Sequence, residues 1–143
     1  MKSGTFDSPR PGAGAISWQL AQTFWVGGLW LLQFVMLPAI TQRTGLAPLL
    51  VEDIASSLRP LMVGLAAACA ALQAMVLVRS QGVTSLWKDL RGQILVAVSA
   101  LAALYLLADG LLPGYWTLFS YMAIAVLGLM LVIQPIPGTG RDV

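Results

Sequence analysis

The sequence predicts an all-α polytopic integral membrane protein, folded as a bundle of four transmembrane helices. Two observations predict this class: 58% of the 143 residues are hydrophobic and only 10% are charged. A soluble domain carries roughly 25% charged residues, and disorder requires few large apolar groups, so both classes are excluded. Each helical crossing uses about 20 residues, and we expect residues 1–143 to form a single membrane domain.

The first predicted span covers residues 15–37, within a stretch that carries no charge between Arg10 and Arg43. Pro38 is expected to end this helix, because proline removes a backbone donor and clashes with the preceding turn. Lys2 and Arg10 before an apolar run also suit a signal peptide. The run exceeds the roughly 7 to 15 residues of such a peptide, however, and no A-x-A-like site follows it. We therefore expect an uncleaved helix.

The connection between the first two spans, residues 44–59, is the longest expected loop. Its apolar residues recur at helical spacing, opposite Glu52 and Asp53, which predicts a short amphipathic helix lying on the outer membrane surface. The other expected segments are the second span 61–78, begun by Pro60, the third span 94–112, the fourth span 115–133, and the tails 1–14 and 134–143.

The distribution of Lys and Arg predicts an orientation in the membrane. With the N-terminus inside, the inner side holds Lys2, Arg10, Arg79, Lys88, Arg91 and Arg141, and the outer side holds Arg43 and Arg59. This bias follows the positive-inside rule and predicts that both termini are cytoplasmic, in a bacterial inner membrane. The basic residues are scattered through short loops rather than gathered into a stripe, so no nucleic-acid partner is expected.

Composition also excludes several kinds of catalytic site. The chain has no His and one Cys, Cys69, which removes His-based nucleophile pairs, His-ligated zinc and internal disulfides. We expect no cofactor, no catalytic residues and no enzymatic activity.

Polar residues within the spans indicate which helix faces turn inward, because a polar group is costly in hydrocarbon. By helical spacing the bundle-facing polar residues are Gln19, Gln22, Thr23, Gln33, Gln73 and Tyr105. They could hydrogen-bond between helices, or they could line a cavity or pathway. Trp25 and Trp30 lie deep in the first span, so we expect them to pack or pair within the bundle.

Opposite charges are expected to meet at the outer rim. Asp109 is the one acid within a predicted span, and Arg59 stands at the outer start of the second. We expect an intramembrane ion pair of Arg59 and Asp109, with Glu52 or Asp53 closing over it, because an unpaired charge there is expensive. The alternative is that Asp109 caps a helix end in headgroup water.

Three other functional classes are compatible with the helix number, but the residues support them weakly. The external acids Asp53 and Asp109 resemble those of lipoprotein signal peptidases, but that family's Asn- and Gly-containing stretches are missing. Small multidrug transporters place a Glu in the first span, and this span has none. Met36, Met62 and Met122 fall near the outer side and offer soft thioether sulfur to Cu(I), although Met is also a common packing residue.

The first span resembles a known family. Phe24-Trp25-Val26-Gly27-Gly28, followed by Phe34-Val35-Met36-Leu37-Pro38-Ala39, is similar to the opening of the small bacterial membrane proteins called domain of unknown function 4149. The resemblance covers about half of the chain and implies four helices without an established activity. The family is distantly similar to copper resistance D membrane domains, which use His and Met. Gly27, Gly28 and Gly64 are expected to admit a neighbouring helix, with Trp25 filling the space beside them.

The expected function is that of a non-enzymatic structural or accessory subunit, with the bilayer and either itself or a larger membrane complex as partners. The alternative is a small transport or copper-handling protein that uses the outward-facing Met, Asp and Arg residues.

The predicted rim pair can be tested by a double-mutant cycle of Arg59→Gln and Asp109→Asn. If the two side chains pair, the double variant should lose less stability than the sum of the single variants, because either substitution alone breaks the same interaction. Unfolding in SDS gives the three free energies. Strictly additive losses would exclude the pair.

Overall fold

The computed structural model describes residues 12–108, 110–111 and 113–135, and in these residues it holds helices and no strand. The elements are α1 (Ala13–Leu31), the π-helical turn η1 (Leu32–Met36), α2 (Leu37–Thr44), α3 (Pro48–Gln81), α4 (Ser85–Lys88), α5 (Leu90–Leu107) and α6 (Gly114–Ile133). Within this part of the chain, four helical stretches are long and apolar enough to cross a membrane. The predicted all-α, four-helix class is confirmed, and the chain is a multi-pass membrane protein.

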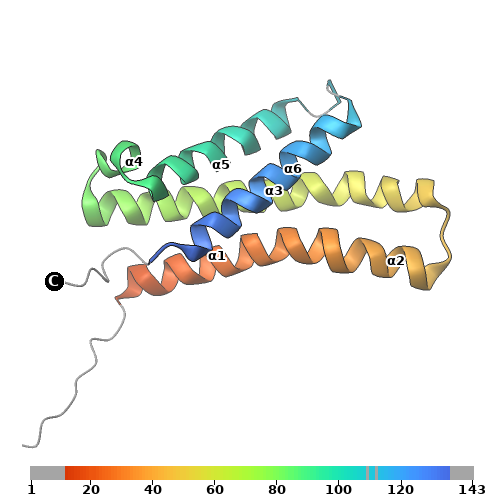
Figure 1. Cartoon of the computed structure of the whole chain (residues 1–143), viewed down its shortest axis with the longest axis horizontal. Helices are drawn as coiled ribbons and strands as arrows, with labels where there is room; N and C mark the ends of the chain where they lie inside the picture. Colours follow the sequence, from red (N-terminus) through yellow and green to blue (C-terminus); the bar gives the residue numbers. More distant parts are fainter. Residues whose placement is uncertain (1–11, 109, 112, 136–143) are drawn as a thin grey trace, which may run out of the picture.

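The four long helices close into a bundle. α1 packs against α3, α3 against α5, α5 against α6, and α6 returns to α1. Figure 1 shows α1 and α2 running as one rod beside α3, with α5 and α6 covering only part of their length. At about 1.5 Å per residue, the 32-residue rod and the 34-residue α3 exceed the 18 residues of α5 and the 20 of α6 by roughly 20 Å. The first helical hairpin therefore projects beyond the second at one end.

The expected end of the first helix at Pro38 is wrong, because the helix continues to Thr44. The chain adjusts one turn earlier, where Leu37 N–H donates to the carbonyl of Leu32 in a π-helical pattern. Such a turn re-satisfies backbone groups near a proline that lacks its own N–H. Gly45, with φ of 60°, ends the rod in a left-handed conformation that suits glycine.

The expected membrane-surface helix at 44–59 is also not a separate element. From Pro48 onward it is the first part of α3, and Pro60 stands inside that helix rather than at its start. Ala55 is buried and Leu58 half-buried, and this part of α3 packs against α2. Its apolar face is thus partly covered by protein, so the segment runs in line with the span instead of turning to lie on the bilayer.

The later helices differ less from the expected spans. α5 begins four residues before 94 and ends at Leu107, and α6 begins one residue before 115 and ends at Ile133 as expected. Most of the predicted tails 1–14 and 134–143 lies outside the described residues.

Aromatic side chains fill the centre of the bundle, and two glycines allow close approaches between helices. Trp18, Trp25 and Tyr121 are the largest fully buried side chains. A Cβ on Gly128 would stand 2.7 Å from the Trp25 ring, and a Cβ on Gly92 would stand 2.4 Å from the backbone of Leu86. The first contact seats α6 on α1, and the second seats α4 on α5.

Gly128→Ala should therefore destabilise the bundle, by about 1–3 kcal/mol for an overpacked core. Gly27→Ala is the matched control, since its Cβ would meet no atom within 4 Å and alanine raises helix propensity. SDS-induced unfolding followed by circular dichroism measures both. Equal effects of the two substitutions would contradict the proposed packing of Gly128 on Trp25.

Candidate functional site

Gln73 forms the central hydrogen-bonded link between α1 and α3. Its Oε1 accepts from the indole Nε1 of Trp25 at 3.0 Å, and its Nε2 donates to the backbone carbonyl of Trp18 at 3.2 Å. Gln73 is 0% exposed, so neither water nor lipid can replace these partners. The amide thus uses both of its ends to hold two turns of α1.

A second pair of hydrogen bonds joins α1 to α6. The indole Nε1 of Trp30 donates to the carbonyl of Ala125 at 3.2 Å, and the hydroxyl of Tyr121 donates to the carbonyl of Leu29 at 2.7 Å. Both bonds lie within one turn of η1. Trp25 and Trp30 were expected to pack or pair within the bundle, and they do so, Trp25 through its bond to Gln73 and Trp30 through its bond to Ala125.

The predicted bundle-facing polar residues divide into two groups. Gln22, Gln73 and Tyr105 are buried, whereas Gln19 and Thr23 are exposed. The exposed group and Gly27 line an open groove of about 360 Å³ between α1 and α6, together with Gln22, Val26, Leu129, Val132 and Gln134. The predicted stripe therefore lies partly in the bundle and partly along this groove.

Gln33 and the predicted glycines have distinct surroundings. Gln33 is half-buried, and its Oε1 makes no hydrogen bond.

A Cβ on Gly28 would meet only the Met62 sulfur, at 3.6 Å, which is ordinary contact. A Cβ on Gly27 or on Gly64 would meet no atom of the chain within 4 Å. The expected close approach of a neighbouring helix is therefore not seen at either glycine within the isolated chain.

The end of the bundle that was predicted to be the outer rim contains one ion pair among the described residues. The Arg59 guanidinium binds the Glu52 carboxylate at 2.8 Å, and the two side chains are 9% and 68% exposed. The Nε of Arg59 is buried without a hydrogen-bond partner, and Tyr121 is close enough to Arg59 and Tyr105 for electrostatic interaction. Asp53 is exposed, and Asp109 lies outside the described residues, as does the expected pair with Arg59.

The sulfur-containing residues are dispersed over the bundle. Met36 is exposed on η1, while Met62 and Met122 are half-buried and pack against the core. Cys69 is buried as a free thiol. In the described ranges, no group of three or more His, Cys, Asp or Glu side chains could hold a metal ion.

The sequence identified most of the buried polar residues, but it did not identify their hydrogen-bond partners. The bond between Trp25 and Gln73 joins positions 48 residues apart, and no local pattern encodes it. Tyr121 and Gly128 on α6 were not singled out, although a tyrosine and a glycine inside an apolar helix are the kind of signal that marks a buried hydrogen bond and a close approach.

Comparisons with known proteins add no relative: no family model, no curated protein and no solved structure matches the chain.

The role of Gln73 can be measured through its partner. Gln73→Leu should lower stability by about 0.6–1.7 kcal/mol, the range for interhelical hydrogen bonds in membranes, because it leaves the Trp25 indole without an acceptor. Gln19→Leu, on an exposed position, should cost nothing measurable. SDS unfolding of Gln73→Leu, Trp25→Phe and the double variant gives the coupling, and a coupling near zero would refute the link.

Proposed function

We propose that the chain is a non-enzymatic structural or accessory subunit of a bacterial inner membrane, associating with itself or with a larger membrane complex. One observation carries this proposal: hydrogen bonds between helices engage the deepest polar side chains. Gln73, Trp25, Trp30 and Tyr121 all bond within the bundle. Side chains used in this way stabilise the packing of the helices, and a substrate would have to displace them.

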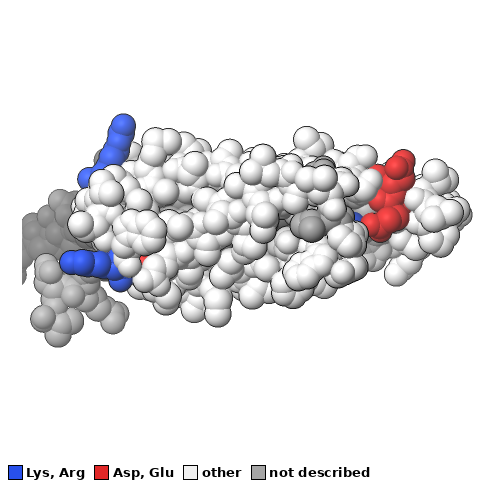
Figure 2. Space-filling model, turned by 90° about the horizontal axis from the view of Figure 1, so that it is seen from above, with Lys and Arg blue, Asp and Glu red and all other residues white. Residues whose placement is uncertain are grey.

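The charge distribution supports an orientation with both termini in the cytoplasm. On the face drawn in Figure 2, most of the visible Lys and Arg lie at one end of the molecule, most of the visible Asp and Glu lie at the other, and the described residues between them are uncharged. Arg79, Lys88 and Arg91 lie beside α4 with one acid, Asp89, whereas Arg43 and Arg59 are balanced by Glu52 and Asp53. The net positive end fits the cytoplasmic side.

The face of α3 that is turned away from the bundle is the surface best suited to association. Leu61, Leu65, Leu72 and Met75 are exposed there, and they frame Gly64 and Ala68 at four-residue spacing. Small residues at this spacing let two membrane helices approach closely. A Cβ on Gly64 would meet no atom of its own chain within 4 Å, so that position is open to another helix.

A photo-crosslinking residue at Leu72 should therefore form protein adducts in the source membrane. The matched control is the same residue at Leu104 on α5, because the two leucines are 54% and 55% exposed. Mass spectrometry of the adducts would identify either a second copy or a partner protein. Gly64→Leu should suppress the Leu72 adduct by steric exclusion, while leaving the fold intact. Equal adducts at both positions, or none, would contradict association through α3.

One specific observation favours transport, within the alternative class of transport or copper handling. The Nε of Arg59 and the Oε1 of Gln33 are buried polar atoms without hydrogen-bond partners, so some polar capacity near the acidic end is not used in packing. Metal analysis of the protein purified in nanodiscs separates the two functions. Stoichiometric copper that is lost on Met62→Leu would replace the accessory role with metal handling.

A further inference from the structure

A polar pocket opens at the basic end of the bundle, where three helices terminate. It has a volume of about 390 Å³ and is lined by Gln81, Asp89, Leu90, Arg91, Gln134 and Pro135. Gln81 ends α3, Asp89 and Arg91 flank the start of α5, and Gln134 follows α6. Four of these six residues are charged or carry an amide.

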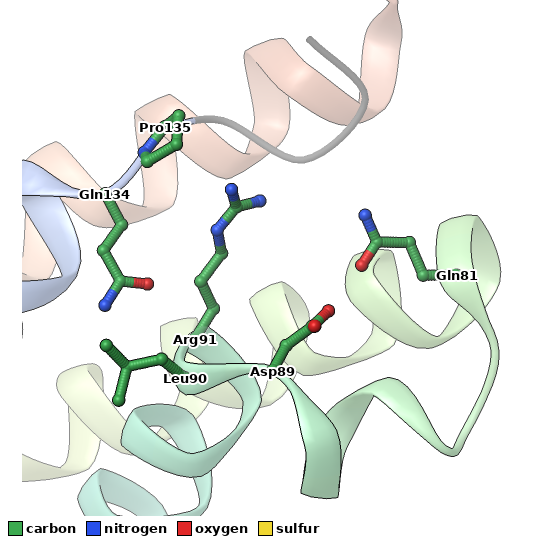
Figure 3. Close-up of a pocket in the computed structure, with 6 residues that line it drawn as sticks. All are labelled: Gln81, Asp89, Leu90, Arg91, Gln134 and Pro135. Carbon is green, nitrogen blue, oxygen red and sulfur yellow. The ribbon is translucent and has the colours of Figure 1, made fainter. Parts of the chain in front are cut away.

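The two charged side chains of this pocket are not paired with each other. The ion pairs of the described residues do not include Arg91 or Asp89. Asp89 stands at the N-cap of α5, but its carboxylate makes no capping hydrogen bond. Figure 3 shows the Arg91 guanidinium extending into the space between Pro135 and Gln81, with the Asp89 carboxylate directed toward the same side. An anionic and a cationic group of one ligand would fit this arrangement.

The local packing fixes the backbone that carries these two side chains. Gly92 lets the α5 backbone lie against the backbone of Leu86 in α4, and Gln93 Nε2 donates to the carbonyl of Trp87 at 3.0 Å. Trp87 and Leu90 are large exposed apolar side chains at the same end. Tryptophan prefers the level of the lipid headgroups, which places the pocket mouth in that layer.

A groove along the span shares one lining residue with the pocket. Gln134 lines both the pocket and the groove between α1 and α6. The groove presents Gln19, Gln22 and Thr23 on one wall, with apolar Val26, Leu129 and Val132 beside them. Amides can donate to ester carbonyls, and the apolar side chains can contact acyl chains, so the pocket and groove offer partners for both the polar and the apolar parts of a phospholipid.

We propose that the pocket and groove together bind one phospholipid with a phosphoethanolamine headgroup. Arg91 binds the phosphate, Asp89 binds the primary amine, and Gln134 and Gln22 donate to the ester region. A guanidinium binds phosphate by charge-assisted hydrogen bonds, and the carboxylate disfavours a headgroup that lacks a cation. The site therefore selects phosphatidylethanolamine over phosphatidylglycerol. This inference is independent of the proposed association through α3.

Native mass spectrometry of the full chain, released from nanodiscs with equal amounts of the two lipids, tests the selection. We expect one retained phosphatidylethanolamine. Arg91→Gln should reduce its occupancy about tenfold, as expected for loss of a charge-assisted contact. Asp89→Asn should invert the preference toward phosphatidylglycerol, and asparagine is as good an N-cap as aspartate, so α5 keeps its start.

Lys88→Gln is the matched control, because it removes one positive charge at the same end without lining the pocket. It should leave the retained lipid unchanged. An equal loss of lipid occupancy in Lys88→Gln and Arg91→Gln would mean that general surface charge retains the lipid, and it would overturn the proposed site. So would equal retention of both lipids by the unaltered chain. Displacement of the lipid by millimolar soluble phosphoethanolamine would show that the pocket binds the free headgroup compound, and it would overturn the proposal of a lipid site.

Discussion

The hydrogen bonds of Gln73 are the interaction on which the rest of the bundle depends. The hydrocarbon region offers no water, so a buried amide must find both a donor and an acceptor within the protein. Gln73 finds them in Trp25 and Trp18, two turns apart on α1, and this fixes the register between α1 and α3. Trp25 held in that position fills the space that Gly128 leaves open on α6. One satisfied amide thus determines how three of the four long helices meet.

The unequal lengths of the two hairpins give the molecule two different ends. The projecting part of α2 and α3 carries the pair of Arg59 and Glu52, where a buried guanidinium and an exposed carboxylate span the change from protein interior to water. At the opposite end, the termini of α3, α5 and α6 line an open pocket. On the face drawn in Figure 2, the described residues between the two ends carry no charge, as the cost of charge in hydrocarbon requires.

Composition and apolar runs were sufficient to predict four helices, because the length of a crossing is fixed by the bilayer. They were insufficient at Pro38 and Pro60, because a proline usually ends or starts a helix. Here both helices continue past the proline, since a π-helical turn precedes Pro38 and α2 packs against α3. The polar faces were predictable from helical spacing, but spacing cannot say which partner a side chain meets. The bonds of Trp30 and Tyr121 cross more than 90 residues, so only the folded chain reveals them.

Close packing in the middle of the bundle constrains where binding can occur. Polar groups such as Gln73 and Tyr121 already have partners there, so a ligand would have to break bonds that hydrocarbon cannot replace. Apart from the buried Arg59 Nε and Gln33 Oε1, the polar groups with unused hydrogen-bonding capacity lie nearer the periphery, at the groove between α1 and α6 and at the helix ends. Arg91 and Asp89 can bind a ligand without loss of any bond that holds the helices together. The same constraint that makes the interior a scaffold therefore directs recognition to the surface shared with lipids and neighbouring chains.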